Sequence, residues 1–277
     1  MTKPIIYQLF PRLFANFNET RKYNGTKEEN GCGRFVDINE RALKAIVDLG
    51  ATHVWYTGVI RHATAQYNHP AITKGKAGSP YAITDYYDVD PDLAKNEAKR
   101  MQEFEDLVKR THAAGLDVLI DFVPNHVSRE YKSVCKPAGV EDLGEKDNPD
   151  WAFSPLNNFY YLPGERFSMD KDLQGYEEFP AKVTGNDCFT SHPSENDWYE
   201  TVKLNYGVFY QGGREKQFNP IPSTWTKMRD ILLFWADKGI DGVRVDMAEM
   251  VPVEFFQWAI AAVRKKHKKF LFIGECY

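Results

Sequence analysis

Segments with the pattern of a β-strand alternate with segments that have the pattern of an amphipathic helix along most of the chain. The predicted strands are short apolar or β-branched runs, at residues 5–10, 53–60, 116–123, 241–246 and 270–276. The predicted helices carry apolar residues at helical spacing, at residues 39–49, 97–114, 223–238 and 252–267. Parallel strands joined by crossover helices have this order, so the sequence predicts an α/β fold with a mostly parallel sheet.

The alternation stops between residues 127 and 220. This stretch is rich in proline, glycine, asparagine, aspartate and aromatic residues, and it has no long periodic segment. A structureless loop of that length is uncommon inside a compact domain. We therefore predict a small irregular subdomain, inserted between the third strand and the third helix.

Five strand–helix steps are fewer than the eight strands that close a (β/α)8 barrel of the TIM type. The expected fold class is therefore a TIM-type barrel truncated after its fifth strand. Residues 1–126 and 221–277 form its two parts, on either side of the insertion at 127–220. On this interpretation the chain ends at an exposed strand edge and is a piece of a longer enzyme.

The bulk composition excludes several classes of partner. The net charge is −4 and no long run of lysine or arginine occurs, so we expect no nucleic-acid partner. No apolar run approaches the roughly 20 residues that span a bilayer, so we expect no membrane association. The N-terminus lacks a signal-peptide pattern and the four cysteines lack a zinc-site spacing, so we expect reduced thiols and a cytoplasmic location. The oligomeric state stays open.

Two of the predicted strands end in a carboxylate. Asp246 ends the run at 242–246, and Glu275 ends the run at 272–275. Parallel barrels present catalytic groups at this edge, and two carboxylates at neighbouring strand ends can cleave a glycosidic bond as acid and nucleophile. Loop aromatics that suit stacking on sugar rings include Tyr67, Tyr81, Tyr86, Tyr87, Trp151, Phe159, Tyr160, Tyr161, Trp198 and Tyr210.

Four short motifs occur in order along the chain. Residues 121–126 read D-F-V-P-N-H, and residues 242–246 read G-V-R-V-D. Gly274-Glu275 follows on the next predicted strand, and residues 79–86 read S-P-Y-A-I-T-D-Y. Together they resemble motifs of the α-amylase family of retaining glycoside hydrolases, which has D-x-x-x-N-H, G-x-R-x-D and G-Y-x-x-x-D-Y at these places. The resemblance covers essentially the whole chain, and it implies that residues 127–220 correspond to the family's domain B.

The resemblance implies a role for each strand-end residue. Asp246 is expected to be the nucleophile that forms a covalent glycosyl-enzyme, with Arg244 orienting it. Glu275 is expected to be the general acid and then the base, with a raised pKa in semi-apolar surroundings. In a retaining pair the two carboxyl groups lie roughly 5 Å apart.

Two further residues are expected to bind substrate. The resemblance implies that His126 hydrogen-bonds hydroxyls of the sugar before the scissile bond, and that Tyr81 stacks on that sugar. Asp121 and Asp85 are expected to brace the mouth of the barrel. His53 opens a strand at the opposite end, so we expect it to be structural.

Many relatives bind a structural calcium ion, and Asn125 lies where the family commonly supplies a ligand. Lys203 stands where a ligand aspartate is common, and Met250 where many calcium-binding relatives have histidine. Calcium prefers oxygen ligands and an ammonium group repels it, so Lys203 and Met250 disfavour calcium here. We predict no metal ligand, and no cofactor is firmly implied.

The family also carries a third carboxylate on its seventh strand, and this chain has no counterpart of it. Loss of one such electrostatic group costs a factor of about 10² to 10³. We therefore expect the 277-residue chain by itself to be poorly folded and inactive.

The resemblance implies a glycoside hydrolase in carbohydrate metabolism. It would cleave α-glucosidic bonds of α-glucans or maltooligosaccharides with retention, so its partner is an oligo- or polysaccharide. One alternative is a transglycosylase on the same substrates, and another is a non-catalytic amylase-like binding module. The five site residues occur together, which argues against the binding module. The absence of GxGxxG and GxxxxGK[ST] loops argues against a phosphate-ligand enzyme. Linkage, chain-length preference, and endo or exo action stay open.

Overall fold

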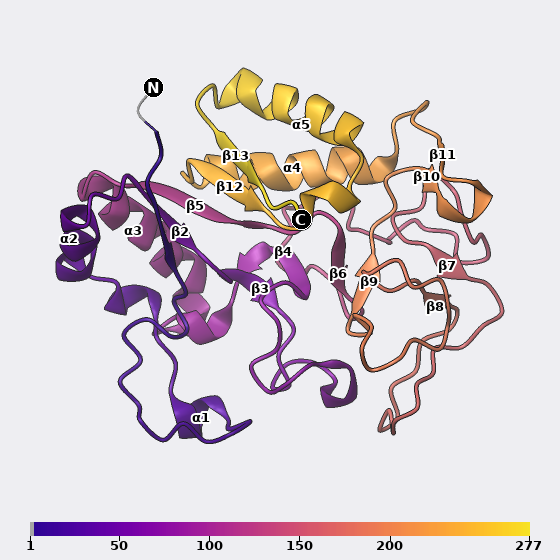
Figure 1. Cartoon of the computed structure of the whole chain (residues 1–277), viewed down its shortest axis with the longest axis horizontal. Coiled ribbons are helices and arrows are strands. Elements are labelled where there is room, and N and C mark those ends of the chain that lie inside the picture. The colour runs from indigo at the N-terminus through magenta and orange to yellow at the C-terminus, as the bar shows by residue number, and fades with distance from the viewer. Residues whose placement is uncertain (1–2) are drawn as a thin grey trace.

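The computed structural model describes residues 3–277, and its centre is a five-stranded sheet (Figure 1). The strands follow the order β1-β2-β5-β12-β13, and every neighbouring pair is parallel. Their bounds are Ile6–Leu9, His53–Tyr56, Asp117–Phe122, Gly242–Val245 and Leu271–Gly274. The predicted parallel sheet is confirmed, with each strand slightly shorter than its sequence pattern.

The α-helices are α1 (Lys27–Asn30), α2 (Glu40–Asp48), α3 (Arg100–Ala113), α4 (Ser223–Asp237) and α5 (Val253–Lys266). Single 3₁₀ turns occur at Phe35–Asp37, Pro70–Ile72, Pro91–Leu93, Glu97–Lys99, Tyr210–Gly212 and Ala248–Met250. The four longer helices match the predicted ones. Asn39 caps α2 by accepting from the Ala42 N–H, and Pro252 directly precedes α5.

The inward helix faces and the sheet form one apolar core. Figure 1 shows α4 and α5 side by side next to β12 and β13. The largest core side chains include Trp235, Phe104 and Phe255, all essentially inaccessible to solvent. Burial of large aromatic side chains dominates the energetics of such a core, so it holds the strand ends in place. None of the described helices combines the length and apolarity needed to cross a membrane.

The second predicted strand divides in two. β2 ends at Tyr56, and β3 (Ile60–His62) pairs antiparallel with β4 (Ile83–Val89) in a separate sheet. Gly58 lies between them with φ of 72°, a conformation that breaks an extended strand. The sequence did not predict β4, because its buried Asp85 and Asp88 are atypical of a strand. Asp88 is paired with Arg61 and Arg100, which compensates its burial.

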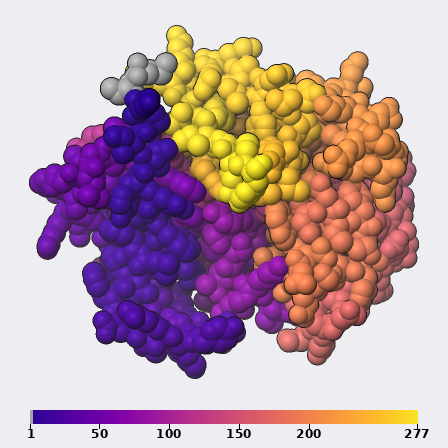
Figure 2. All heavy atoms as spheres, viewed as in Figure 1, coloured from indigo at the N-terminus to yellow at the C-terminus, as the bar shows by residue number. Residues whose placement is uncertain are grey.

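Residues 127–220 have no α-helix and pair only as short strands. β6 (His126–Ser128) pairs with β9 (Thr201–Lys203), β7 (Tyr161–Leu162) with β8 (Ala181–Lys182), and β10 (Val208–Phe209) with β11 (Glu215–Lys216). The segment supplies most of a second apolar cluster around Tyr160, Phe167 and Tyr199, which Ile72 also joins. Figures 1 and 2 show it beside the sheet and against the loops at the sheet's C-terminal edge. Residues 127–220 are thus irregular in the structure, and their assignment as an inserted subdomain stays a prediction.

Candidate active site

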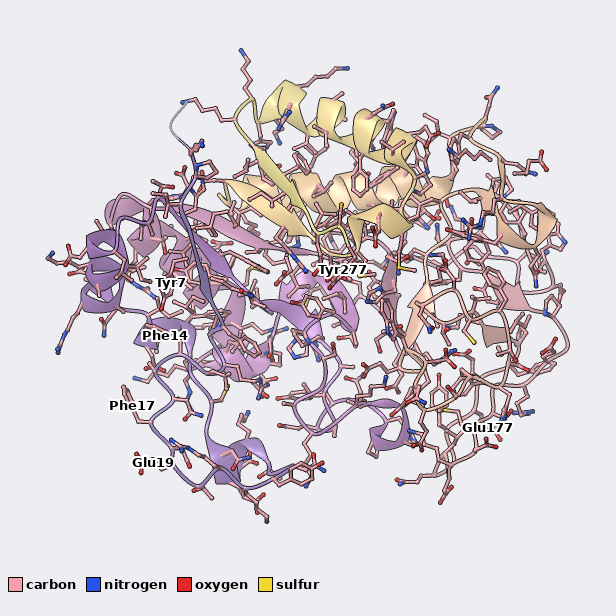
Figure 3. The ribbon with its side chains drawn as sticks, in the orientation of Figure 1. Tyr7, Phe14, Phe17, Glu19, Glu177 and Tyr277 are labelled. Atoms are coloured by element: carbon pink, nitrogen blue, oxygen red, sulfur yellow. The ribbon has the colours of Figure 1, made fainter. Side chains whose placement is uncertain are left out.

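The ends of β12 and β13 bring the two predicted carboxylates into one cleft. Val245 and Gly274 are register partners, and Asp246 and Glu275 are the residues that follow them. The cleft has a volume of about 500 Å³. It is lined by Lys74, Ser79, Tyr81, His126, Trp198, Glu200, Thr201, Arg244, Asp246, Met247, Glu275 and Tyr277. Figure 3 marks its position through the Tyr277 label at the end of β13. All five predicted site residues lie in this cleft.

The guanidinium group of Arg244 contacts both carboxylates. Its Nη1 lies 2.7 Å from Asp246 Oδ1, and its Nη2 forms an ion pair with Glu275. Nη1 also lies 3.4 Å from Asp121 Oδ1. Arg244 and Asp246 are two residues apart in the chain, so their side chains project to the same face, as the sequence predicts. One cation therefore holds the two carboxylates together.

Burial controls the protonation of Asp246. It raises the pKa of Asp246 to about 6, and the charge of Glu275 acts in the same direction. Arg244 opposes both effects, because its ion pair favours the carboxylate form. Asp246 is therefore a carboxylate at neutral pH and takes up a proton in mildly acidic solution.

The predicted rise in the pKa of Glu275 is wrong for this arrangement. Partial burial raises the pKa, but three contacts outweigh it, and the pKa of Glu275 lies below its usual value. The Met247 N–H and the Tyr277 hydroxyl donate to the carboxylate, both at 3.1 Å, and Arg244 adds its charge. Tyr277, which the sequence offered as a semi-apolar neighbour, acts here as a hydrogen-bond donor, so the contacts of the carboxyl group favour its ionised form.

His126 is buried and neutral. Burial and, to a smaller extent, the nearby charge of Lys203 together lower the pKa of His126 to about 3. The amide of Asn125 is oriented by two contacts, since its Nδ2 donates to Gly185 O and its Oδ1 accepts from Lys203. The same Nδ2 lies 3.1 Å from His126 Nδ1, so Nδ1 is an acceptor and the ring proton is on Nε2.

The ammonium of Lys203 occupies the place that the resemblance gives to calcium. The side chain is 2% exposed, and Nζ lies 2.7 Å from Asn125 Oδ1 and 2.5 Å from Asp187 Oδ1. A calcium ion that used the Asn125 oxygen would meet this ammonium group, so the residues here do not fit calcium. Met250 lines a neighbouring cavity of about 710 Å³ and brings no oxygen ligand.

Tyr81 lines the cleft beside Arg244, whose guanidinium carbon is 5.4 Å from the centre of the tyrosine ring. Burial raises the pKa of Tyr81 to about 12, so its hydroxyl is neutral. An uncharged aromatic ring at this place suits stacking on the apolar face of a sugar.

The residues expected to be structural make structural contacts. Asp121 accepts from the Trp55 indole N–H and from the Gly58 N–H. Asp85 accepts from the Ser133 hydroxyl and from the Val134 and Cys135 N–H groups. His53 lies at the other end of β2, where it pairs with Asp117.

Sequence reasoning did not assign seven of the cleft residues to the site, and two parts of the chain outside the strand ends supply four of them. Lys74 comes from the loop between β3 and β4, and Trp198, Glu200 and Thr201 come from the 127–220 segment. Trp198 was one of many loop aromatics, and nothing in the local sequence separates it from the others. Tyr86 and Tyr160, from the same group, are buried in apolar clusters.

The comparisons with known proteins agree with this geometry. The sequence model of the alpha-amylase catalytic domain matches residues 8–270. An alpha-1,4-glucan:maltose-1-phosphate maltosyltransferase of Cereibacter sphaeroides is 25% identical over 93% of this chain and 35% of its own length. An alpha-amylase of Streptomyces lividans is 26% identical over 96% of this chain and 30% of its own length.

A solved structure shares the fold. The crystal structure of an alpha-amylase from Lactobacillus plantarum aligns with a TM-score of 0.58 and 25% identity, over 98% of this chain and 45% of the other. The chain therefore spans about a third of the length of the two curated relatives and less than half of this structure.

Proposed function

The chain belongs to the alpha-amylase family of catalytic domains, a TIM-barrel family, and from this premise we propose that its parent protein is a retaining glycoside hydrolase. Its substrates are α-glucans or maltooligosaccharides, and it cleaves their α-glucosidic bonds. The observation that carries the proposal is the shared contact of Arg244 with Asp246 and Glu275 at neighbouring strand ends. An acid and a nucleophile of a retaining enzyme need this proximity.

In the first step the Asp246 carboxylate attacks the anomeric carbon and the bond to the leaving sugar breaks. Glu275 gives its proton to the leaving oxygen, so the departing sugar is a neutral alcohol. Glu275 has to exchange its contact with Arg244 for the glycosidic oxygen before it can act. In the second step Glu275 takes a proton from water, and the water oxygen displaces Asp246 from the sugar.

The neighbouring residues support these steps. Arg244 favours the ionised form of Asp246 against the effect of burial, which keeps the nucleophile available at neutral pH. His126 and Tyr81 line the same cleft and are suited to hold the reacting sugar, by a hydrogen bond and by stacking. No step uses a metal ion.

Transglycosylation is the second candidate. The similarity to a maltosyltransferase favours it, because a sugar hydroxyl then replaces water in the second step with the same residues. The non-catalytic binding module is disfavoured, because the two carboxylates, Arg244, His126 and Tyr81 converge on one cleft.

We also propose that residues 127–220 are an inserted subdomain between two barrel parts, at 1–126 and 221–277. The second apolar cluster and the antiparallel β6–β9 pairing support this division. Its contribution to the cleft through Trp198, Glu200 and Thr201 gives it a direct influence on substrate choice.

The proposal is tested by the fate of maltoheptaose and pullulan with the full-length protein. We expect cleavage, with α-anomers as the first products in a time-resolved NMR experiment. Addition of a free acceptor sugar separates hydrolysis from transfer, because a transglycosylase forms new oligosaccharides. Release of β-anomers, or sugar binding without cleavage, would overturn the proposal.

Asp246→Asn tests the nucleophile. The amide does not attack the anomeric carbon, so turnover should fall by at least about 10³-fold while the fold persists. Circular dichroism and thermal unfolding serve as the control for folding. Activity within a few-fold of the parent would remove Asp246 from this role.

A further inference from the structure

The cleft has one wall that the proposed catalytic residues do not use. It is formed by Trp198, Glu200 and Thr201, which reach the cleft from the irregular segment. Trp198 is the large aromatic residue of this wall, and it is only partly buried. Its ring centre lies 5.3 Å from that of His126, with the rings inclined by 59°.

The indole N–H of Trp198 differs from those of three other tryptophans. Trp55, Trp225 and Trp235 each donate their indole N–H to an oxygen, at 2.8 to 3.1 Å. Among the described residues Trp198 has no such acceptor. Its indole nitrogen is also not among the buried polar atoms without a partner, so it keeps access to solvent. An aromatic face with an unused donor, facing a cleft, is typical of a binding surface.

The backbone that carries Trp198 is held from both sides. Thr201 donates to Trp198 O through its N–H and its hydroxyl, at 2.8 and 2.9 Å. Lys74 donates through Nζ to Asp197 O and through its N–H to Glu200, both at 2.9 Å. A side chain on a fixed backbone loses little freedom on binding, so it is preorganised for a ligand.

We propose that Trp198 is a specificity-determining residue that stacks on the sugar unit next to the one held by His126 and Tyr81. This inference rests on the proposed function. The ligand is a pyranose with an apolar face, whose hydroxyl groups can accept the indole N–H. Lys74 is a positioning residue, which acts by fixing residues 197–200. The wall thus makes the enzyme select substrates by chain length.

The test compares maltoheptaose with 4-nitrophenyl α-glucoside, using the full-length protein. Trp198→Ala should raise KM for maltoheptaose about tenfold, the factor that corresponds to about 1.4 kcal/mol of lost aromatic contact. Its kcat should stay within about twofold, because the contact is made equally in the ground and transition states. The small glucoside should respond little, and Trp198→Phe should keep most of the affinity.

Two matched controls are available. Trp151 is an exposed tryptophan of the same segment outside the cleft, so Trp151→Ala should leave both KM values unchanged. Lys74→Met should raise KM for maltoheptaose in the same direction as Trp198→Ala, whereas Lys76→Met, at an exposed lysine two residues away, should not.

Calorimetry of maltoheptaose binding to Asp246→Asn, with and without Trp198→Ala, measures the contact without turnover. Equal affinities would overturn the inference, as would equal losses on both substrates or the same loss in Trp151→Ala. These outcomes leave the proposed function untouched if Asp246→Asn is inactive. Activity of Asp246→Asn would instead refute the proposed function itself.

Discussion

A single arginine sets the charge balance of the two proposed catalytic groups. Arg244 contacts Asp246 and Glu275 together, and the pKa of Asp246 is raised while that of Glu275 is lowered. The more buried carboxyl group therefore holds a proton more tightly than the more exposed one in the free protein. Substrate has to reverse this order by separating Glu275 from Arg244.

Glu275→Gln tests the acid role. The amide supplies no proton, so hydrolysis of maltooligosaccharides should fall by about 10²- to 10⁴-fold. Substrates with activated leaving groups, such as 4-nitrophenyl α-glucoside, need little protonation, so formation of the glycosyl-enzyme should be largely spared. The pre-steady-state burst measures that step. Equal losses on both kinds of substrate would remove Glu275 from the acid role.

Lys203 is a buried cation whose partners come from separate parts of the chain. Lys203→Met leaves the Asn125 oxygen and the Asp187 carboxylate without their donor, and we expect a loss of about 2–4 kcal/mol in the free energy of unfolding. Urea unfolding measures this loss. The exposed Lys265→Met is the control and should change stability by less than about 0.5 kcal/mol. An unchanged stability in Lys203→Met would show that the buried ammonium is not a structural tie.

At the scale of elements, the close approach of β12 and β13 depends on a glycine. A Cβ atom at Gly242 would lie 2.4 Å from the Leu271 carbonyl oxygen on the adjacent strand. Neither backbone can yield without parting the two strands that carry Asp246 and Glu275. The absence of a side chain at 242 is therefore a condition for the geometry of the pair.

Gly242→Ala should destabilise the protein by about 1–3 kcal/mol and lower activity, because the overpacked strands separate. Gly274→Ala, on the partner strand, is the matched control, since its Cβ would meet only ordinary contacts of 3.4 Å or more. Thermal unfolding and kcat/KM of both variants check this. Equal losses of stability and activity in Gly242→Ala and Gly274→Ala would show that the pair does not depend on the absence of a side chain at 242.

At the scale of the whole molecule, the cleft joins three separate parts of the chain. The strand ends supply the proposed catalytic pair, and the loop after β3 supplies Lys74 and Tyr81. Trp198, Glu200 and Thr201 supply the third wall. Burial by these parts raises the pKa of Asp246. The pH dependence of the reaction therefore depends on the assembly of the cleft.

The pair has to carry one proton in total to react. Since the pKa of Asp246 is about 6 and that of Glu275 is lowered, the free pair loses its last proton as the pH rises through about 6. We expect kcat/KM to be highest in mildly acidic solution and to fall above about pH 6. Initial rates across the pH range measure this.

In Glu275→Gln the pH dependence of kcat/KM for an activated substrate should have the opposite direction. Only ionisation of Asp246 then matters, so the rate should rise with pH. The rise should lie below about pH 6, because the charge of Glu275 no longer raises the pKa of Asp246. A decrease of kcat/KM with rising pH in this variant would show that the proton required for the reaction is not held by Asp246 and Glu275. The predicted cytoplasmic location is independent of these measurements and stays a prediction.

The sequence by itself determined the order of strands and helices and the place of Asp246, Arg244 and Glu275 at neighbouring strand ends. These features depend on the local spacing of apolar side chains. Side chains that share a face recur every two residues along a strand and every three to four residues along a helix. The four motifs in order were enough to predict the family. β4 was not predicted, because its buried carboxylates are atypical of a strand pattern.

Only the tertiary structure decided how these groups interact. Asn125 and Lys203 lie 78 positions apart in the chain, and no local pattern predicts that one orients the other beside His126. The lowered pKa of Glu275 depends on contacts with Arg244 and Met247 from the adjacent strand and its end, together with the nearby Tyr277 hydroxyl. Trp198 reaches the cleft through the path of an irregular segment. Burial and charge act through space, so their effects appear only once distant residues are brought together.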